Sequence, residues 1–357
     1  MLPFLAEHHG DPARLHAEGR VTRVAIEDAR ELVATLFGAR PREVVFTSSG
    51  TEAVNHAIWG GVRRAGLGGD IVTTAVEHSS VLDACRREPG ELTLVGVDAL
   101  GRFDPAEIES AITADTVFVS VQLANHEVGT LQPVAAVCEA ARARGVLVHI
   151  DACAGAGHVP IDFAALGADL LSVSAHKLGG PKGVGALLIR RGLRLSPLII
   201  GGAQERERRS GLENVPAIIG FGAAAAELTA DGRLAAQAAT SRRLTDEIVQ
   251  EATTTIPGVV QYGDPDDRVP HLVCLGIEGV EAEPILLALD QHGVAIHSGS
   301  ACSSEALEPS PVLEAMGADA DRSLRVSTGW SSTETDARTL LDELSGIVAS
   351  LRALRSR

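Results

Sequence analysis

The sequence lacks the cysteine patterns that staple small secreted folds or hold structural zinc. Its 357 residues include five cysteines, and none of them forms a CxxC pair. An odd number of isolated thiols argues against a disulfide framework and against a zinc knuckle. The twelve histidines include no HExxH motif, so we expect no metal site. Reduced thiols in the cytoplasm are the better interpretation.

Long apolar runs and a basic composition are missing as well. No apolar segment reaches the roughly 18 residues that cross a bilayer. Glu7, His8 and His9 interrupt the apolar start of the chain, which argues against a signal peptide. The formal net charge is -16, with acidic residues spread along the chain. Such a surface disfavours direct binding to nucleic acid or to a membrane.

What the chain does contain is an alternation of short apolar runs with helical segments. Strands are predicted at 43–46, 70–73, 116–121, 146–150, 170–174 and 184–189. Helices are predicted at 22–37, 51–64, 81–87 and 133–144, before one long Ala-rich helix over about 217–252. This order predicts an α/β fold of βαβ units with a mostly parallel sheet.

The length and this pattern predict two unequal domains. We expect a large α/β domain at 15–252. We expect a smaller α+β domain formed by 1–14 together with 253–357, with a strand at 272–277 and a closing helix at 335–354. The smaller domain would carry the segment around Cys302.

Lys177 directly follows a predicted buried strand, in Ser174-Ala-His-Lys177-Leu-Gly-Gly-Pro-Lys-Gly. Burial would free such an amine as a nucleophile for Schiff-base chemistry. The alternative is an ordinary surface lysine where a strand leaves the sheet. The flanking residues favour the first interpretation.

Two further segments end predicted strands with groups that suit a cofactor. Asp151 closes an apolar strand, at the edge where α/β sheets bind ligands, although it can also be a helix cap. In Phe46-Thr-Ser-Ser-Gly50-Thr51-Glu52 a strand leads through small residues into a helix, which suits an anion such as phosphate. The alternative for this second segment is an ordinary capping box.

Cys302 lies in His297-Ser-Gly-Ser-Ala-Cys302-Ser-Ser, among small residues. A reactive thiol needs such an exposed setting. A buried and inert thiol is instead the expectation for Cys274, within an apolar strand, and for Cys138, on a helix.

Together these segments resemble the cysteine desulfurases of the NifS/IscS type, in the class V aminotransferase family. The resemblance runs from about Asp11 to the C-terminus. Its most specific parts are the Lys177 segment and Gly299-Ser-Ala-Cys302-Ser-Ser with Leu307-Glu-Pro-Ser, which is similar to the IscS-like rather than the SufS-like subgroup. The resemblance implies a pyridoxal-phosphate (PLP) dependent transferase of fold type I, with a seven-stranded sheet in the large domain, and a homodimer.

By matching positions, the resemblance implies cofactor-binding residues. Lys177 would hold PLP covalently, and Asp151 would pair with the ring nitrogen. His78 would stack on the ring and shuttle protons, although alone it can be a core histidine. The phosphate would be held by Gly50, Thr51, Ser174 and His176.

It also implies substrate-side residues. Asn125 would bind the ring hydroxyl and substrate, but can be a turn residue. Arg325 would bind the substrate carboxylate through a bidentate contact, but can be a salt-bridged strand residue. Cys302 would receive the sulfur.

The chain departs from the family pattern at several positions. The family's opening strand and its Ala-Thr-Thr-Pro-like turn are absent from the sequence, and Asp11 stands where relatives have asparagine. Ala154 replaces a glutamine that helps hold the ring hydroxyl. Leu212 replaces a threonine that reaches the partner subunit's phosphate. Loss of one such hydrogen bond would weaken cofactor binding by about 1 kcal/mol.

The implied activity is removal of sulfur from L-cysteine, giving L-alanine and a persulfide on Cys302. That sulfur would pass to an acceptor protein for iron–sulfur cluster assembly, or to an enzyme of tRNA or DNA thiolation. Two alternatives stay open: selenocysteine lyase or another class V C–S lyase, and a truncated non-catalytic paralogue that serves as a partner-binding scaffold.

Overall fold

The computed structural model describes residues 1–357 except 65, 67, 299–308 and 356–357. The chain forms two compact units. The first comprises Met1–Val95, Asp104–Leu123 and Pro133–Leu234, and the second comprises Gly96–Phe103, Ala124–Gln132 and Ala235–Arg357. These boundaries differ from the expected ones. Residues 1–14 belong to the first unit, because α1 (Leu2–Ala6) contacts α9 (Val215–Thr229).

The first unit is built on a seven-stranded sheet in the order β1-β7-β6-β5-β4-β2-β3. Its strands are β1 Val44–Thr47, β2 Asp70–Thr74, β3 Leu92–Val95, β4 Thr116–Gln122, β5 Leu147–Asp151, β6 Leu170–Ser174 and β7 Gly185–Ile189. Strand β7 runs antiparallel to both of its neighbours, and the other pairs are parallel. The predicted mostly parallel sheet of seven strands is therefore confirmed.

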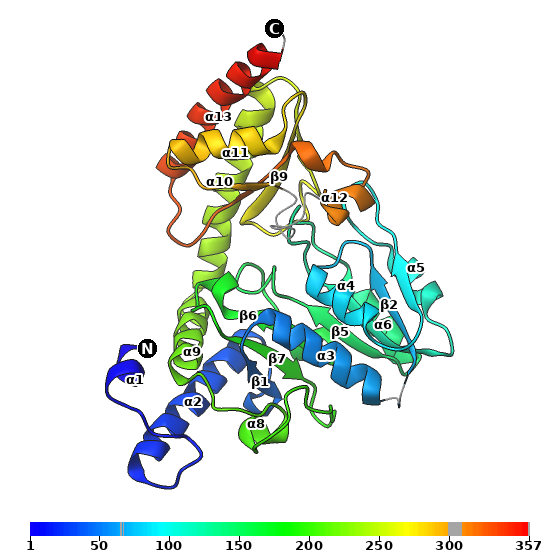
Figure 1. The fold of residues 1–357 in the computed structure, drawn as a ribbon, viewed down its shortest axis with the longest axis vertical. Coiled ribbons are helices and arrows are strands. Elements are labelled where there is room, and N and C mark those ends of the chain that lie inside the picture. The colour runs from blue at the N-terminus through cyan, green and yellow to red at the C-terminus, as the bar shows by residue number, and fades with distance from the viewer. Residues whose placement is uncertain (65, 67, 299–308, 356–357) are drawn as a thin grey trace. The chain divides into compact units, whose positions relative to one another are not determined.

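Helices accompany this sheet because its strands are apolar along their length. Every residue of β6 and β7 is buried, as expected for strands covered on both faces. Helix α3 packs against both of these strands (Figure 1). The helices of this unit with their short turns are α2 Ala17–Leu36, η1 Pro41–Glu43, α3 Gly50–Arg64, α4 Ser79–Arg86, α5 Pro105–Ala111, α6 Val134–Ala143, α7 Phe163–Leu166, η2 Ala175–Leu178 and α8 Gln204–Glu207, besides α1 and α9.

The long helix predicted at 217–252 is wrong in one respect. The structure has two helices here, α9 and α10 (Arg233–Thr255). Between them Asp231 and Gly232 adopt positive φ angles of 26° and 76°, which end a right-handed helix. The Asp-Gly pair is a turn signal that the apolar pattern on both sides obscured.

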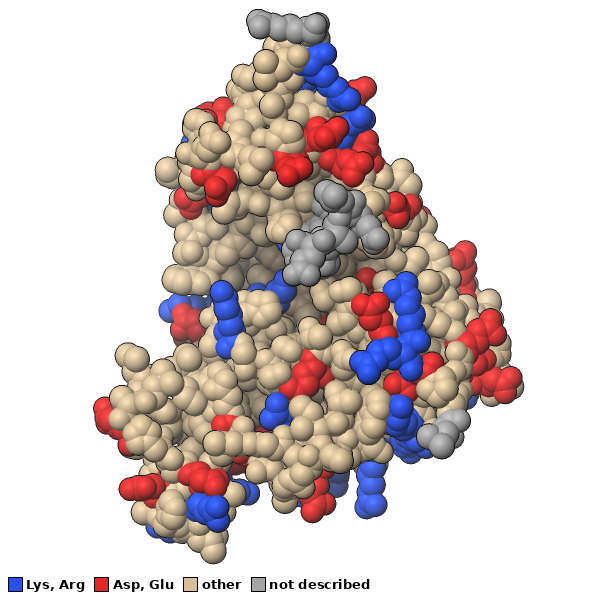
Figure 2. Space-filling model, in the orientation of Figure 1, with Lys and Arg blue, Asp and Glu red and all other residues tan. Residues whose placement is uncertain are grey.

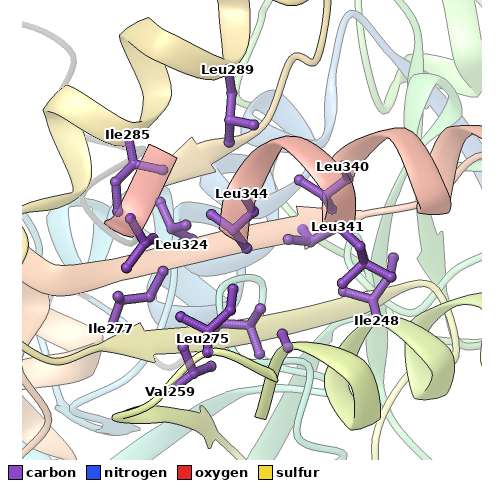
Figure 3. Close-up of a cluster of buried hydrophobic side chains, with 14 of the residues drawn as sticks. Ile248, Val259, Leu275, Ile277, Ile285, Leu289, Leu324, Leu340, Leu341 and Leu344 are labelled. Carbon is purple, nitrogen blue, oxygen red and sulfur yellow. The ribbon is translucent and has the colours of Figure 1, made fainter. Parts of the chain in front are cut away.

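The second unit holds a four-stranded antiparallel sheet in the order β10-β11-β9-β8. Its core joins this sheet to α11 and α13, and the labelled side chains in Figure 3 are all aliphatic. The elements are β8 Val259–Tyr262, β9 Leu272–Ile277, α11 Ala282–Gln291, β10 His297–Ser298, α12 Pro311–Ala315, η3 Ala320–Arg322, β11 Ser323–Ser327 and α13 Glu334–Arg355. Strand β9 and helix α13 were predicted, whereas the shorter strands were not.

On the face seen in Figure 2, basic side chains lie among acidic ones. Within the described residues, no helix combines the length and the apolar character that crossing a membrane requires.

Candidate active site

The candidate site of the first unit lies where the parallel strands β4, β5 and β6 end. Pairing places Gln122 beside Asp151, and Asp151 beside Ser172. The carboxyl ends of adjacent parallel strands meet at one edge of the sheet, so polar side chains from distant parts of the sequence gather there. All three of these residues are buried.

Asp151 is held by two donors on one oxygen. The Ser172 hydroxyl donates to Oδ1 at 2.8 Å, and the backbone N–H of Cys153 donates to the same atom at 3.1 Å. Asp151 is 6% exposed. Hydrogen bonds to a carboxylate favour its ionised form, so this arrangement prepares a fixed negative charge at the sheet edge.

Lys177 lies in the turn η2, directly after β6. Gly179 ends this turn with a φ of 87°, which a glycine accepts readily. The expectation that the amine is buried is wrong, because the side chain of Lys177 is exposed. The turn places Lys177 beyond the end of β6. The Lys177 carbonyl is hydrogen-bonded to His158 Nε2 at 2.9 Å.

The charges of both Asp151 and Lys177 affect the pKa of the Cys153 thiol. Burial, followed by the charge of Asp151, raises the pKa of this thiol well above its usual range, whereas the charge of Lys177 acts in the opposite direction. Lys177 follows β6, and β6 pairs with β5, the strand that Asp151 ends. The amine and the carboxylate required by the PLP hypothesis thus come from the ends of two neighbouring strands.

The start of α3 forms the anion-binding side of this cluster. An added Cβ on Gly50 would lie 2.6 Å from the Cys153 sulfur and 3.1 Å from Ser174 Cβ, so the helix start lies directly against both residues. The Ser174 hydroxyl is hydrogen-bonded to His176 Nδ1 at 2.9 Å. Thr51 is exposed in the first turn of the helix. Backbone N–H groups, hydroxyls and an imidazole thus gather where a phosphate fits.

Ordinary capping is present at this helix as well. The backbone N–H of Glu52 donates to the Ser49 hydroxyl at 3.1 Å, and the Glu52 carboxylate accepts from Ser48 N–H at 2.8 Å. Glu52 is also paired with Arg209 at 2.8 Å. The capping interpretation and the anion-site interpretation of this segment are therefore compatible.

His78 is the N-cap of α4 rather than a core histidine. Its Nδ1 accepts a hydrogen bond of 3.1 Å from the backbone N–H of Ser80. The Ser80 hydroxyl lies 2.8 Å from the same ring nitrogen. The half-buried side chain is thereby fixed in orientation.

Behind His78 lies a buried network that the sequence analysis missed. Glu77 Oε1 accepts from the Thr74 hydroxyl at 2.6 Å and from Gln122 N–H at 3.1 Å. The Gln122 side chain donates to the Val76 carbonyl at 2.9 Å. The available signal was a glutamine and a glutamate at the ends of two apolar strands.

Asn125 lies in the second unit, in a tight turn. Its Oδ1 accepts from the backbone N–H groups of Glu127 and Val128, both at 2.9 Å. The turn closes at Gly129, whose φ is 81°. Asn125 is therefore a turn residue, whose side-chain oxygen closes the turn.

Arg325 also lies in the second unit, on β11, and is half-buried. It donates to the His126 carbonyl at 3.2 Å. Across the ranges that the structure describes, no carboxylate pairs with this guanidinium, so the salt-bridge alternative has no support.

Cys302 falls outside the described residues. The four other thiols are poorly suited to attack a substrate. Burial raises the pKa of Cys85 and of Cys138 to about 12, and it raises that of Cys274 further. The predictions that Cys138 and Cys274 are buried and inert are confirmed.

Two of the family departures are placed by the structure. Ala154 is half-buried directly after Cys153, and Leu212 is 68% exposed. A leucine at this degree of exposure offers apolar contact where a threonine offers a hydroxyl.

The residues of the first unit fit the implied cofactor. The start of α3 with Ser174 and His176 suits the phosphate, Asp151 suits a protonated pyridine nitrogen, and Lys177 supplies the amine. Partial desolvation and the charges of Lys177 and Lys182 lower the pKa of His176, so its ring is neutral at neutral pH.

Comparison with known proteins agrees with this chemistry. The family model of the class-V aminotransferases matches residues 1–340. The chain is 41% identical to cysteine desulfurase IscS of Dictyoglomus turgidum, over 99% of this chain and 91% of that protein. It is similar in structure to a NifS-like protein, with a TM-score of 0.89 and 31% identity over 98% of this chain and 94% of that one.

A further solved structure, SspA in complex with cysteine, has a TM-score of 0.80 and 28% identity, over 91% of this chain and 92% of that one. The coverage is nearly complete in each comparison, so the likeness extends to the whole chain rather than to one motif. The chain belongs to the class-V aminotransferase family, in its branch of NifS/IscS-like cysteine desulfurases.

Proposed function

We propose that this chain removes sulfur from L-cysteine with PLP held on Lys177, and that Cys302 receives the sulfur. The observation that carries the proposal is the cluster around Cys153. The Cys153 N–H donates to Asp151, Gly50 lies against the Cys153 sulfur, and Lys177 follows the strand that pairs with the one ending at Asp151. The proposal is also supported by the full-length likeness to cysteine desulfurases.

When bound, PLP supplies an electron sink for charge that develops on the substrate. The chain's part is to hold and polarise it. Gly50, Thr51, Ser174 and His176 would bind the phosphate. Asp151 would keep the pyridine nitrogen protonated, which is what makes the ring electron-withdrawing.

His78 and Lys177 are the proposed proton-transfer groups. The Nδ1 of His78 accepts from the Ser80 N–H, which fixes the ring of this proposed proton-transfer group. The Lys177 amine is exposed and can take the substrate's α-proton once the substrate amine has replaced it.

In the second unit, Asn125 and Arg325 are the proposed substrate-side groups. The guanidinium of Arg325 suits a substrate carboxylate, which it can bind through two parallel hydrogen bonds. The amide nitrogen of Asn125 suits a ring hydroxyl or a substrate oxygen. The cysteine complex of the structural neighbour SspA supports an amino acid of this size as substrate.

Sulfur transfer would proceed by attack of the Cys302 thiolate on the substrate sulfur. A sulfur–sulfur bond forms as the carbon–sulfur bond of cysteine breaks, and the electron pair remains with carbon. That carbon takes up a proton to give L-alanine, and the persulfide stays on Cys302. A sulfur-acceptor protein would then remove the outer sulfur.

A homodimer and a reducing compartment such as the cytoplasm complete the proposal. Ile200 and Leu212 are 80% and 68% exposed, and a second copy of the chain would cover such apolar side chains. The described cysteines form no disulfide, which suits a reducing compartment.

The proposal is tested with purified protein, PLP, L-cysteine and a thiol reductant, which releases the outer persulfide sulfur as sulfide. Cys302→Ser should retain the visible absorption of bound PLP but lose sulfide release. Cys138→Ala removes a buried thiol and should release sulfide at the wild-type rate. Full sulfide release by Cys302→Ser would overturn the assignment of the sulfur acceptor.

Competition between L-cysteine and L-selenocysteine separates desulfurase from selenocysteine lyase. We expect L-cysteine to be consumed with alanine and sulfide in equal amounts. A protein that stays colourless when PLP is added, and releases nothing from either amino acid, would instead support the scaffold alternative.

A further inference from the structure

Behind Asp151, three buried side chains form a hydrogen-bonded row across three neighbouring strands. The Ser120 hydroxyl on β4 lies 2.8 Å from His149 Nδ1 on β5. His149 Nε2 lies 3.1 Å from the Ser172 hydroxyl on β6, which donates to Asp151 at 2.8 Å. Ser120, His149 and Ser172 are each 0% exposed.

The direction of every hydrogen bond in this row follows from its last member. An ionised carboxylate can only accept, so the single hydroxyl proton of Ser172 points to Asp151. The Ser172 oxygen must then accept from His149 Nε2–H. With Nε2 protonated and the ring neutral, Nδ1 accepts from the Ser120 hydroxyl.

The neutrality of His149 has a physical cause. Burial lowers the pKa of His149 to about 4, although the nearby charge of Asp151 acts in the opposite direction. The ring of Phe118 stacks at a centroid distance of 6.4 Å and keeps water away. The other titratable groups near the end of the row are Cys153, whose thiol is protonated, and Lys177.

We propose that His149 is a positioning residue that acts through Ser172 to keep Asp151 ionised and fixed in orientation. It rests on the proposed function, since an ionised Asp151 matters because of the pyridine nitrogen it would pair with. In this row His149 sets the direction in which Ser172 donates to the carboxylate, and Ser120 in turn holds His149. A lone serine could rotate its hydroxyl, whereas Ser172 is held from behind by an imidazole N–H.

The row also has a second arrangement. If Asp151 takes up a proton, the carboxyl donates to Ser172, Ser172 donates to His149 Nε2, and the histidine carries its proton on Nδ1. The tautomer of His149 therefore reports the charge of Asp151. This readout exists in the protein with or without PLP.

The first experiment is nitrogen NMR of the full-length chain labelled at histidine, without PLP, with the His149 signals identified by their loss in His149→Gln. At neutral pH we expect a neutral ring with its proton on Nε2, and loss of this preference in Ser172→Ala. A charged ring, or a proton on Nδ1, would overturn the row.

The second experiment is a pH titration of the visible absorption of the PLP-loaded protein. Ser172→Ala removes a hydrogen bond to a charged group, so its acid-side midpoint should rise by about one pH unit. His149→Leu should shift it in the same direction, and Ser120→Ala by less. Wild-type midpoints in both Ser172→Ala and His149→Leu would refute the positioning role.

His56→Leu is the matched control. His56 is another buried histidine of the same unit, 1% exposed, on α3, and burial lowers its pKa to about 4 as well. Its titration midpoint should equal that of the wild type. If the chain bound no PLP, the proposed function would fail while the NMR measurement still decided the row.

Discussion

The two sheets of this protein differ in what they bury. At the carboxyl edge of the seven-stranded sheet, Ser120, His149 and Ser172 have no exposed surface. At the centre of the four-stranded sheet, the residues with no exposed surface include Leu275 and Leu324. Both sheets bury aliphatic side chains, but the first also buries a row of polar groups joined by hydrogen bonds across three of its strands.

This difference separates chemistry from stability. Full burial of a leucine stabilises a fold by about 1.5–3 kcal/mol, whereas a hydrogen bond contributes about 1 kcal/mol net. A buried polar row is therefore a weak source of stability and a strong source of orientation. We expect mutations at the seven-stranded edge to change reactivity, and mutations in the four-stranded core to change the free energy of unfolding.

The largest expected effect is that of Lys177→Ala. Loss of the amine should remove covalently bound PLP and abolish sulfide release from cysteine. Because the side chain is exposed, the free energy of unfolding should change by less than about 0.5 kcal/mol.

Absorption spectra, sulfide assays and urea titrations provide the three measurements. Lys182→Ala, at another exposed lysine five positions on, should retain both colour and activity. A large loss of stability in Lys177→Ala would contradict the expectation that substitutions at the edge of the seven-stranded sheet change reactivity rather than the free energy of unfolding.

Leu344→Ala tests the opposite side of the comparison. Leu344 lies on α13, is 0% exposed and belongs to the core in Figure 3. Removal of its side chain should lower the free energy of unfolding by about 2–5 kcal/mol, through lost burial and the cavity left behind.

Urea titration would measure this loss, and PLP absorption of the folded variant should match the wild type. Leu354→Ala, on the same helix but 66% exposed, should cost less than about 0.5 kcal/mol. Equal effects of the two substitutions would contradict the proposed core.

Acid should weaken the first unit through its three buried histidines, His56, His149 and His158, whose pKa burial lowers in each case. The pKa of His56 and of His149 lies at about 4 in the folded chain, against an ordinary value of 6.5. Between these values the unfolded chain binds more protons, so stability falls as the pH falls from about 6.5 to about 4. His56 and His149 each contribute up to about 3 kcal/mol to this loss.

Urea titrations at pH 7 and pH 4.5 would measure the acid loss of stability. His56→Leu should remove the share of this histidine, up to about 3 kcal/mol, without altering the PLP spectrum. An unchanged acid dependence in this variant would show that His56 titrates normally in the folded protein.

The sequence predicted elements where the apolar pattern was continuous. Strand β6 was predicted with its observed bounds, and β5 ends one residue beyond the prediction, at Asp151. In the second unit, β8 and β11 were missed, because four or five residues carry too little pattern to separate a strand from a loop.

The candidate site was predicted in part for the same reason. Asp151 ends a strand and Lys177 follows one, so the local sequence was enough to predict both. His149 was not predicted, because its partners Ser120 and Ser172 come from other strands, 29 and 23 residues away. Ser120, His149 and Ser172 meet through the pairing register of three strands, which no single segment of the sequence determines.

Gly50 has a consequence for how this site can vary. The helix start, the Cys153 sulfur and Ser174 share a fixed volume, because even a methyl group at residue 50 would collide with that sulfur. A larger residue at 50 therefore requires a smaller one at 153. The two positions should be inherited as a pair, which makes residue 153 a determinant of how closely the phosphate-binding helix approaches the sheet.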